Sequence, residues 1–412
     1  MKQVSISGER QLNRLRILGQ IGRDTDGKLT RLAASDADKL GRDQFVTWIE
    51  EAGLRLEIDK IGNIFGLWEP DPRSSEKPLM IGSHIDTVIH AGIYDGCYGV
   101  LAGLEIIETL KEADCIPSCP LVVAAFTNEE GVRYAPDMMG SLVYAGGLDV
   151  NEALKTTGTD GSVLGAELEK IGYSGHNEPG FIQPSAYLEL HIEQGPILER
   201  EGITIGAVEN LQGISWQRVV IDGDANHAGT TPITMRRDAG YAAARIITFL
   251  RDRALASNTP TVATVGCIGF EPNAINVIPS RAFFTVDLRD PNEEKLKSEE
   301  QALSAFIEKI GAEENVEISV ERLARFQPVK FDRNLVAQIE HAAKGRTLTH
   351  KKMTSGAGHD AQMIARIAPT AMIFVPSKNG ISHNPKEFTA DNDLIAGANV
   401  LLDVVCSITK PD

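Results

Sequence analysis

Five short segments of this chain each carry a side chain that binds metals well. The segments are SHIDT (83–87), YDGC (94–97), NEEG (128–131), LHIEQG (190–195) and SHNPKE (382–387). The candidate ligands in them are His84, Asp95, Glu130, His191 and His383. Three imidazoles and two carboxylates suit zinc or manganese, whereas calcium asks for oxygen ligands almost throughout. We therefore expect a pair of divalent metals that activates water in a hydrolase.

Each candidate also has an ordinary structural explanation when it is taken alone. Asp86 stands two residues after His84 and can accept a hydrogen bond from its distal nitrogen, but such a pair is a weak signal. Asp95 lies in a glycine-rich turn, where it can bridge two cations or serve only the turn. His191 on an apolar strand can be a core histidine, and His383 a loop histidine without a role. The prediction of a metal site therefore depends on the presence of all five residues together.

Two adjacent carboxylates, Glu129 and Glu130, follow an apolar strand. They repel each other unless positive charge lies close by, and a metal pair would supply it. We expect Glu130 to be a ligand and Glu129 to be the general base, which deprotonates water and later protonates the leaving nitrogen. From the residues alone, the two roles could also be exchanged between Glu129 and Glu130. The pair could equally be an acidic turn that is exposed to water.

A second polar set lies in the middle of the chain. His227 in NHAGTTP is flanked by small residues that permit close approach to a ligand. Asn276 and Arg289 are its predicted companions, and the Arg289 guanidinium can clamp a carboxylate with two parallel hydrogen bonds. A salt bridge at a strand end is an equally good explanation of Arg289.

The overall composition is that of an acidic, soluble enzyme. The 41 basic and 57 acidic residues give a net charge of -16, which disfavours nucleic acid and anionic membranes as partners. The 5 cysteines form no even framework, and a chain of 412 residues needs no disulfides. No apolar run resembles a leader or an uninterrupted membrane span. We expect a cytoplasmic protein.

Hydrophobic periodicity divides the chain into two domains. Up to about residue 210, strands at 63–69, 78–86, 120–128 and 186–193 alternate with helices such as 35–53 and 99–113. This rhythm predicts an α/β sheet covered on both faces, with the ligand segments at the carboxyl ends of its strands. Residues 213–326 instead read β-α-β-β-α-β, the order of the ferredoxin-like split unit. The expected domains are 1–212 with 327–412, and an inserted 213–326.

Together the segments resemble the M20 metallopeptidase clan. The resemblance runs from GNIFG (62–66) through SGAGHDA (355–361) to SHNPKE, and it is closer to the amidase branch. That branch holds N-carbamoyl-L-amino acid hydrolases, allantoate amidohydrolases and β-ureidopropionases. Peptidases and deacylases of the clan carry aspartate or glutamate at the position of His191, which favours the amidase branch. RYAPDMMGSLVYAGGL (133–148) looks more like carbamoyl-amino-acid hydrolases than allantoate enzymes.

The resemblance implies a fold and a cofactor. It implies an α/β, exopeptidase-like catalytic domain with two divalent metals per subunit, zinc or manganese, with cobalt or nickel as alternatives. It also implies that the inserted ferredoxin-like α+β domain is a lid and a homodimer interface. His84 and His191 would hold one metal, Glu130 and His383 the other, and Asp95 would bridge them.

The resemblance also assigns roles to residues that bind no metal. Glu129 would be the base, Asp86 its supporting carboxylate through His84, and His227 would stabilise the oxyanion, often in the partner subunit's site. The implied substrate-binding residues are Gln194, His227, Asn276, Arg289 and Gly358. The expected reaction is hydrolysis of the ureido carbon–nitrogen bond of N-carbamoyl-L-amino acids, releasing ammonia, carbon dioxide and the amino acid. Allantoate hydrolysis, an aminoacylase or dipeptidase, and a non-catalytic binding protein are the alternatives.

Overall fold

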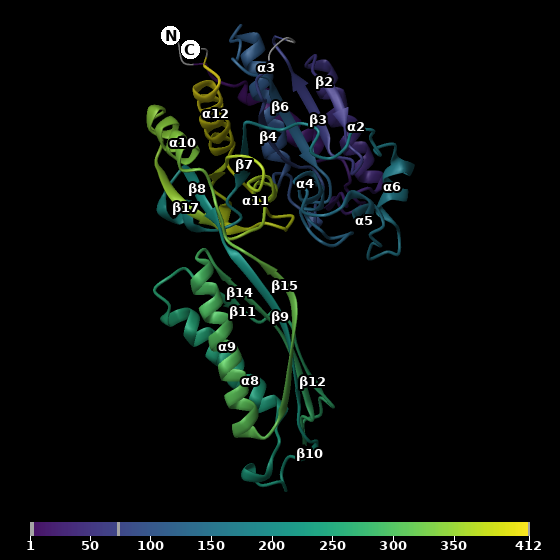
Figure 1. The fold of residues 1–412 in the computed structure, drawn as a ribbon, viewed down its shortest axis with the longest axis vertical. Coiled ribbons are helices and arrows are strands. Elements are labelled where there is room, and N and C mark those ends of the chain that lie inside the picture. Colours follow the sequence, from purple (N-terminus) through teal and green to yellow (C-terminus); the bar gives the residue numbers. More distant parts are fainter. Residues whose placement is uncertain (1–3, 72–74, 411–412) are drawn as a thin grey trace. The chain divides into compact units, whose positions relative to one another are not determined.

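The computed structural model describes residues 4–71 and 75–410, which divide into two compact units (Figure 1). Unit 1 contains the chain up to Glu209 and from Phe331 onward, and unit 2 is Asn210–Lys330. Unit 2 extends slightly beyond the predicted 213–326, because Leu211 pairs with Val329 at its base. Both ends of the chain thus contribute to unit 1.

Unit 1 is built on one large mixed sheet. Its strands are β2 (Arg55–Ile58), β3 (Ile64–Trp68), β4 (Leu79–His84), β6 (Leu121–Phe126), β7 (Ala186–Ile192), β8 (Ile205–Leu211), β17 (His350–Ser355) and β18 (Thr370–Val375). The order β8-β18-β7-β4-β6-β3-β2 has β17 paired with β8. The central strands β18, β7, β4 and β6 run parallel to one another. Every residue of these four strands is buried, as expected of parallel strands covered on both faces.

Helices cover both faces of this sheet. They are α1 (Gly8–Leu18), α2 (Asp36–Glu51), α3 (Cys97–Glu112), α4 (Met139–Tyr144), α5 (Val150–Leu154), α6 (Leu164–Ile171), α7 (Ile197–Glu201), α10 (Arg333–Gly345), α11 (Asp360–Ile364) and α12 (Asp391–Ile408). Gly397 of α12 lies against the Leu190 side chain, whereas the first turn of α11 bonds to the Glu189 side chain. Neighbouring side chains of a strand point to opposite faces, so α12 and α11 lie on opposite faces. The α/β prediction is confirmed.

Three further short strands complete the described strands of unit 1 and its border. They are the two-stranded pair β1 (Leu29–Thr30) and β5 (Ile89–Ala91), and the short strand β16 (Val329–Lys330) beside β8. None of the described helices is both long and apolar enough to cross a bilayer. The five cysteines are unpaired.

Unit 2 has the predicted β-α-β-β-α-β order with small additions. Its strands are β9 (Gly213–Asp222), β10 (Asn226–His227), β11 (Val262–Thr264), β12 (Ile268–Glu271), β13 (Val277–Ile278), β14 (Arg281–Asp290) and β15 (Glu317–Phe326), and its helices are α8 (Ala239–Ala256) and α9 (Glu293–Glu314). The antiparallel sheet has the order β11-β14-β9-β15, with β12 also paired to β14. Two short strands, β11 and β12, stand where the predicted order has a single strand, and β10 pairs with β13 as a separate ribbon.

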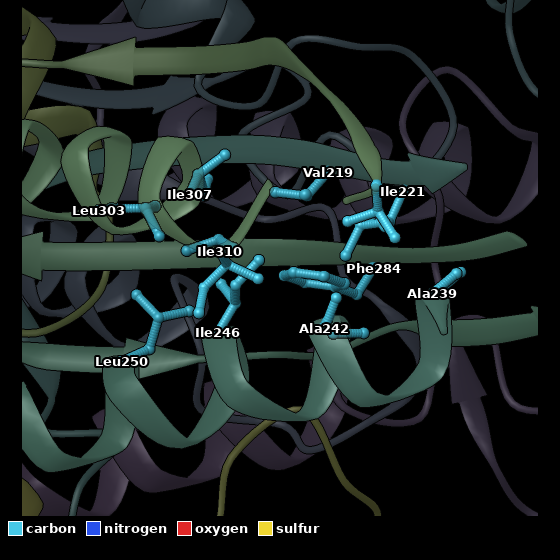
Figure 2. Packing of buried hydrophobic residues seen from close by; sticks show 14 of the residues in the cluster. Val219, Ile221, Ala239, Ala242, Ile246, Leu250, Phe284, Leu303, Ile307 and Ile310 are labelled. Atoms are coloured by element: carbon cyan, nitrogen blue, oxygen red, sulfur yellow. The ribbon is translucent and has the colours of Figure 1, made fainter. Parts of the chain in front are cut away.

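The core of unit 2 lies between its sheet and the helices α8 and α9 (Figure 2). Ile246 and Leu250 of α8 meet Ile307 of α9 and Phe284 of β14 there. The side chains of β14 alternate between buried and more exposed positions, so that Phe284 is 1% exposed and Phe283 is 40% exposed. This alternation is the signature of a sheet with one covered face.

Phe284→Ala should destabilise unit 2 by about 3–5 kcal/mol, because it removes a buried ring and leaves a cavity. Phe283→Ala is the matched control, and its cost should be less than half as large because its ring is already in partial contact with water. Urea denaturation followed by circular dichroism measures both. Equal losses for the two variants would contradict the assignment of the core.

Candidate active site

The carboxyl ends of three neighbouring parallel strands carry the first group of site residues. His84 is the last residue of β4, Glu129 and Glu130 follow the end of β6, and His191 lies near the end of β7. β4 pairs with both β6 and β7, so these ends meet at one edge of the sheet. This is the edge at which open α/β sheets place their sites.

Asp95 reaches the same place from the turn before α3. The turn ends at Gly96, which has a φ of 64°, and a Cβ there would lie 2.4 Å from the His84 ring. A side chain at Gly96 would therefore suffer both backbone strain and a clash. The glycine lets the turn pass directly over His84 and brings the Asp95 carboxylate to it.

The five predicted ligands form two groups that share Asp95. His84, Asp95 and His191 make one group that could hold a metal, and Asp95, Glu130 and His383 make the other. Oδ1 of Asp95 lies 3.1 Å from Nε2 of His191 and 3.7 Å from Nε2 of His84. Oδ2 of Asp95 lies 3.2 Å from Nε2 of His383, which is itself 3.3 Å from Glu130. Each oxygen of one carboxylate thus faces a different group.

The pKa values of these groups reflect burial together with crowded negative charge. Burial, reinforced by the Asp95 carboxylate, raises the pKa of Glu130 to about 8. Burial also raises the pKa of Glu129 well above its ordinary value, and Asp360 and Glu130 add to the effect. The hydrogen bond with Asp95 raises the pKa of His383 to about 9. Such shifts mean that the carboxylates need added positive charge to be ionised together.

Divalent metals fit this donor set. The available atoms are imidazole nitrogens and carboxylate oxygens, which are the ordinary ligands of zinc and manganese. Oε1 of Glu130 is buried and has no hydrogen-bond partner among the described residues. Burying a carboxylate oxygen without a hydrogen-bond donor raises the free energy of the folded protein, and a bound cation would offset that increase.

Asp86 makes different contacts from the predicted ones. Nδ1 of His84 lies 3.0 Å from the backbone oxygen of Asp86, and the Asp86 carboxylate is 3.8 Å away. The carboxylate instead accepts the backbone N–H groups of Glu129 (3.2 Å) and Glu130 (3.3 Å). The backbone, and not the carboxylate, therefore orients His84. Asp86 itself holds the turn that presents the two glutamates.

Glu129 lies inside the cluster beside the first metal group. Its Oε2 is 3.4 Å from Nε2 of His84, and the residue is 8% exposed. The preceding Asn128 has a φ of 57°, and its amide donates to the backbone oxygen of Tyr134 (2.8 Å). Asn128, Gln194 and His383 all have a positive φ, so left-handed backbone gathers around this cluster.

Two predicted substrate residues also belong to unit 1. Nε2 of Gln194 donates to Oδ2 of Asp95 (2.9 Å), so its side chain lies against the shared carboxylate. Gly358 lies in the loop between β17 and α11, where an added Cβ would be 2.9 Å from the Met138 side chain. A larger residue at 358 would have to displace Met138.

The other three predicted substrate residues belong to unit 2, and they do not form one cluster there. His227 is in β10, and Asn276 lies next to it because its backbone oxygen accepts the N–H of Ala228. Arg289 lies near the far end of β14, opposite Ile214, and its guanidinium bonds to Asp287 (2.9 and 3.1 Å). The predicted polar set is therefore split. The interaction of Arg289 with Asp287 is the salt bridge that the sequence left open.

His359 and Glu189 were missed as site residues. His359 is 2% exposed, its ring centre is 4.5 Å from that of His191, and it forms a third possible metal group with His191 and Glu189. Glu189 accepts hydrogen bonds from the Ser83 hydroxyl and the Ala361 N–H. The His-Asp pair after Gly358 was the available signal for His359. The sequence held no such signal for Glu189, apart from its position two residues before His191.

Comparisons with known proteins agree with this geometry. The profile described as peptidase family M20/M25/M40 matches residues 80–407. An N-carbamoyl-L-amino-acid amidohydrolase of Rhizobium meliloti is 40% identical over 97% of this chain and 96% of its own length. An allantoate amidohydrolase of Bacillus subtilis (strain 168) is 35% identical over 94% of each chain.

Solved structures extend the similarity to the fold. A hydantoinase/carbamoylase family amidase from Burkholderia multivorans is 40% identical and superposes with a TM-score of 0.95, over 99% of this chain and 100% of that one. The predicted resemblance is confirmed. The chain belongs to peptidase family M20/M25/M40, a family of metal-dependent hydrolases that includes enzymes cleaving carbon–nitrogen bonds.

Proposed function

We propose that this protein hydrolyses the ureido carbon–nitrogen bond of N-carbamoyl-L-amino acids and releases ammonia, carbon dioxide and the amino acid. The observation that carries the proposal is the Asp95 carboxylate, whose two oxygens face two separate ligand groups. The relatives support the substrate class, because the Rhizobium meliloti protein is named for N-carbamoyl-L-amino acids. Allantoate, a related ureido acid, is the second candidate substrate because of the Bacillus subtilis relative.

The proposed chemistry divides between metals and side chains. A divalent pair held by His84, His191, Asp95, Glu130 and His383 would polarise the ureido carbonyl and make a water more acidic. Glu129 takes the proton of the attacking water and delivers it to the leaving nitrogen, which departs as ammonia. The remaining carbamate then loses carbon dioxide to give the free amine. Asp86 supports this step by holding the backbone of Glu129.

Residues of both units supply the substrate contacts in this proposal. His227 and Asn276, which lie apart from Arg289 within unit 2, would act in the partner subunit's site, where His227 stabilises the developing oxyanion. There Asn276 would join the partner subunit's Arg289 and the backbone at Gly358 in binding the substrate carboxylate. Gln194 lies near the ureido group, which its contact with Asp95 supports. We also propose that unit 2 acts as a lid and as the interface of a homodimer. Exposed apolar side chains on unit 2 support a role in association: Ile233 (76%), Met235 (74%) and Ile275 (104%).

The remaining parts of the proposal concern the metal and the compartment. We propose zinc or manganese, with cobalt or nickel as substitutes, because imidazole and carboxylate donors bind all four ions. The cell's supply decides among them more than the donor types do. We propose the cytoplasm as the compartment, which the five unpaired cysteines support.

Glu129→Gln should keep both metals and lose turnover. The amide cannot accept the proton of the water, so kcat should fall by at least the roughly 10²- to 10⁴-fold typical of general acid–base catalysis. Elemental analysis of the dialysed variant measures the metals, and ammonia release measures turnover. A variant with near-normal turnover would show that Glu129 is not the base.

Chelation should abolish ammonia release, and adding back manganese, zinc or cobalt singly should restore it. The restored enzyme should act faster on N-carbamoyl-L-amino acids than on allantoate or N-acetyl amino acids. Faster cleavage of the acetylated compounds would favour an aminoacylase. Inactivity of the metal-replete protein on the whole panel would favour a binding protein.

Arg289→Lys should raise KM for ureido acids roughly 10-fold or more, since a hydrogen bond to a charged group contributes about 1.5–3 kcal/mol. Lysine cannot reproduce the two parallel hydrogen bonds of a guanidinium. The control is a ureido compound that lacks the carboxylate, for which KM should change little. An equal rise of KM for both compounds would mean that Arg289 serves the structure of β14.

A further inference from the structure

A single buried carboxylate joins two loops of the site that are 293 residues apart in sequence. Oε1 of Glu387 accepts the backbone N–H groups of Tyr94 (3.1 Å) and Asp95 (3.3 Å). Oε2 of the same residue accepts the hydroxyl of Ser382 (2.9 Å). Glu387 is only 6% exposed, so these bonds replace its contacts with water. It therefore ties the turn of Asp95 to the loop of His383.

The Ser382 side chain completes the connection. Its hydroxyl also lies 3.2 Å from Oδ2 of Asp95, and Nε2 of Gln194 lies 3.3 Å from the same hydroxyl oxygen. The next residue along the chain is His383. Glu387 thus contacts the backbone of one member of the second metal group and the neighbour of another, without belonging to the group itself.

The chain just before Asp95 passes close to this carboxylate. A Cβ placed on Gly92 would lie 2.1 Å from Oε1 of Glu387. Gly92 does not have a positive φ, so its backbone would accept alanine. A side chain at position 92 would therefore displace the Glu387 carboxylate.

The two metal groups differ in how firmly they are held. His84 and His191 belong to buried strands of the central sheet. His383 lies in a loop, its side chain is 52% exposed, and its backbone has a φ of 53°. A residue that fixes this loop against the Asp95 turn should therefore matter most to the group of Asp95, Glu130 and His383.

We propose that Glu387 is a positioning residue that sets the spacing between the Asp95 carboxylate and the His383 imidazole, and so the affinity for the second cation. The proposal rests on the metal pair of the proposed function. It does not depend on the substrate. Outer partners of metal ligands typically change metal affinity by roughly 10- to 100-fold when they are removed.

The test compares Glu387→Ala with the matched control Glu193→Ala. Glu193 is 8% exposed and likewise accepts two backbone N–H groups, those of Ile197 (2.8 Å) and Leu198 (2.9 Å). Those amides belong to α7, which carries no predicted ligand. Zinc binding to the metal-free proteins is titrated against a chromophoric chelator, without substrate. Hydrogen exchange of the metal-free proteins measures how well the backbone amides of residues 92–97 and 382–387 are protected.

Glu387→Ala should bind the first zinc as the unmodified protein does and the second roughly 10- to 100-fold more weakly. Exchange should accelerate at 92–97 and 382–387 in this variant, and only around 197–198 in Glu193→Ala. Glu387→Gln, which keeps an acceptor oxygen for the Tyr94 and Asp95 N–H groups, should recover most of the protection.

Gly92→Ala perturbs the same carboxylate without removing it and should also weaken the second site. Unchanged zinc affinities in both Glu387→Ala and Gly92→Ala, or unchanged exchange at 92–97, would overturn the inference and leave the proposed function standing. An unmodified protein that binds fewer than two zinc ions would overturn the metal pair, and the role of Glu387 with it.

Discussion

Repulsion among buried carboxylates is the constraint on which the rest of this site depends. Asp86, Asp95, Glu129 and Glu130 gather at the ends of three parallel strands, and burial deprives them of water. Burial raises the pKa values of Glu129 and Glu130, and the neighbouring carboxylates add to the effect. The histidines alone relieve it incompletely. A pair of divalent cations would let all the carboxylates stay ionised, so the fold supplies an arrangement that is completed by metal.

Strands position the two buried histidines of the site, and turns position its carboxylates. Strands β4 and β7 fix the imidazoles of His84 and His191 inside a sheet that is buried on both faces. The carboxylates come from turns: Asp95 lies in the turn before α3, and Glu129 and Glu130 lie in the turn after β6. Backbone amides of these turns are then held by other carboxylates, by Asp86 for the glutamates and by Glu387 for Asp95.

The sequence predicts much of this because patterns and motifs depend on local physics. Short apolar segments located β3, β4, β6 and β7, and the β-α-β-β-α-β pattern located the main strands and helices of unit 2. Ligand types alone assembled the five residues that the structure brings together around Asp95. The strands β8 and β17 and the helix α1 were not predicted, because their apolar patterns are short or mixed with polar residues.

What could not be predicted depends on three-dimensional detail. The spacing of His84 and Asp86 allows the carboxylate to reach the ring, but the backbone oxygen is the atom that bonds to it. Arg289 and His227 lie apart because they belong to different parts of unit 2. No sequence motif predicts this separation. Glu189 was overlooked because its place in the sequence says nothing about its neighbours in the fold, and His359 because the His-Asp pair after Gly358 was not used as a signal.

The most direct test of the shared carboxylate is anomalous diffraction from crystals grown with manganese or zinc. Two peaks about 3.5–4 Å apart are expected, one beside His84 and His191 and the other beside Glu130 and His383, with Asp95 between them. A single peak, or two peaks that do not flank Asp95, would contradict the account.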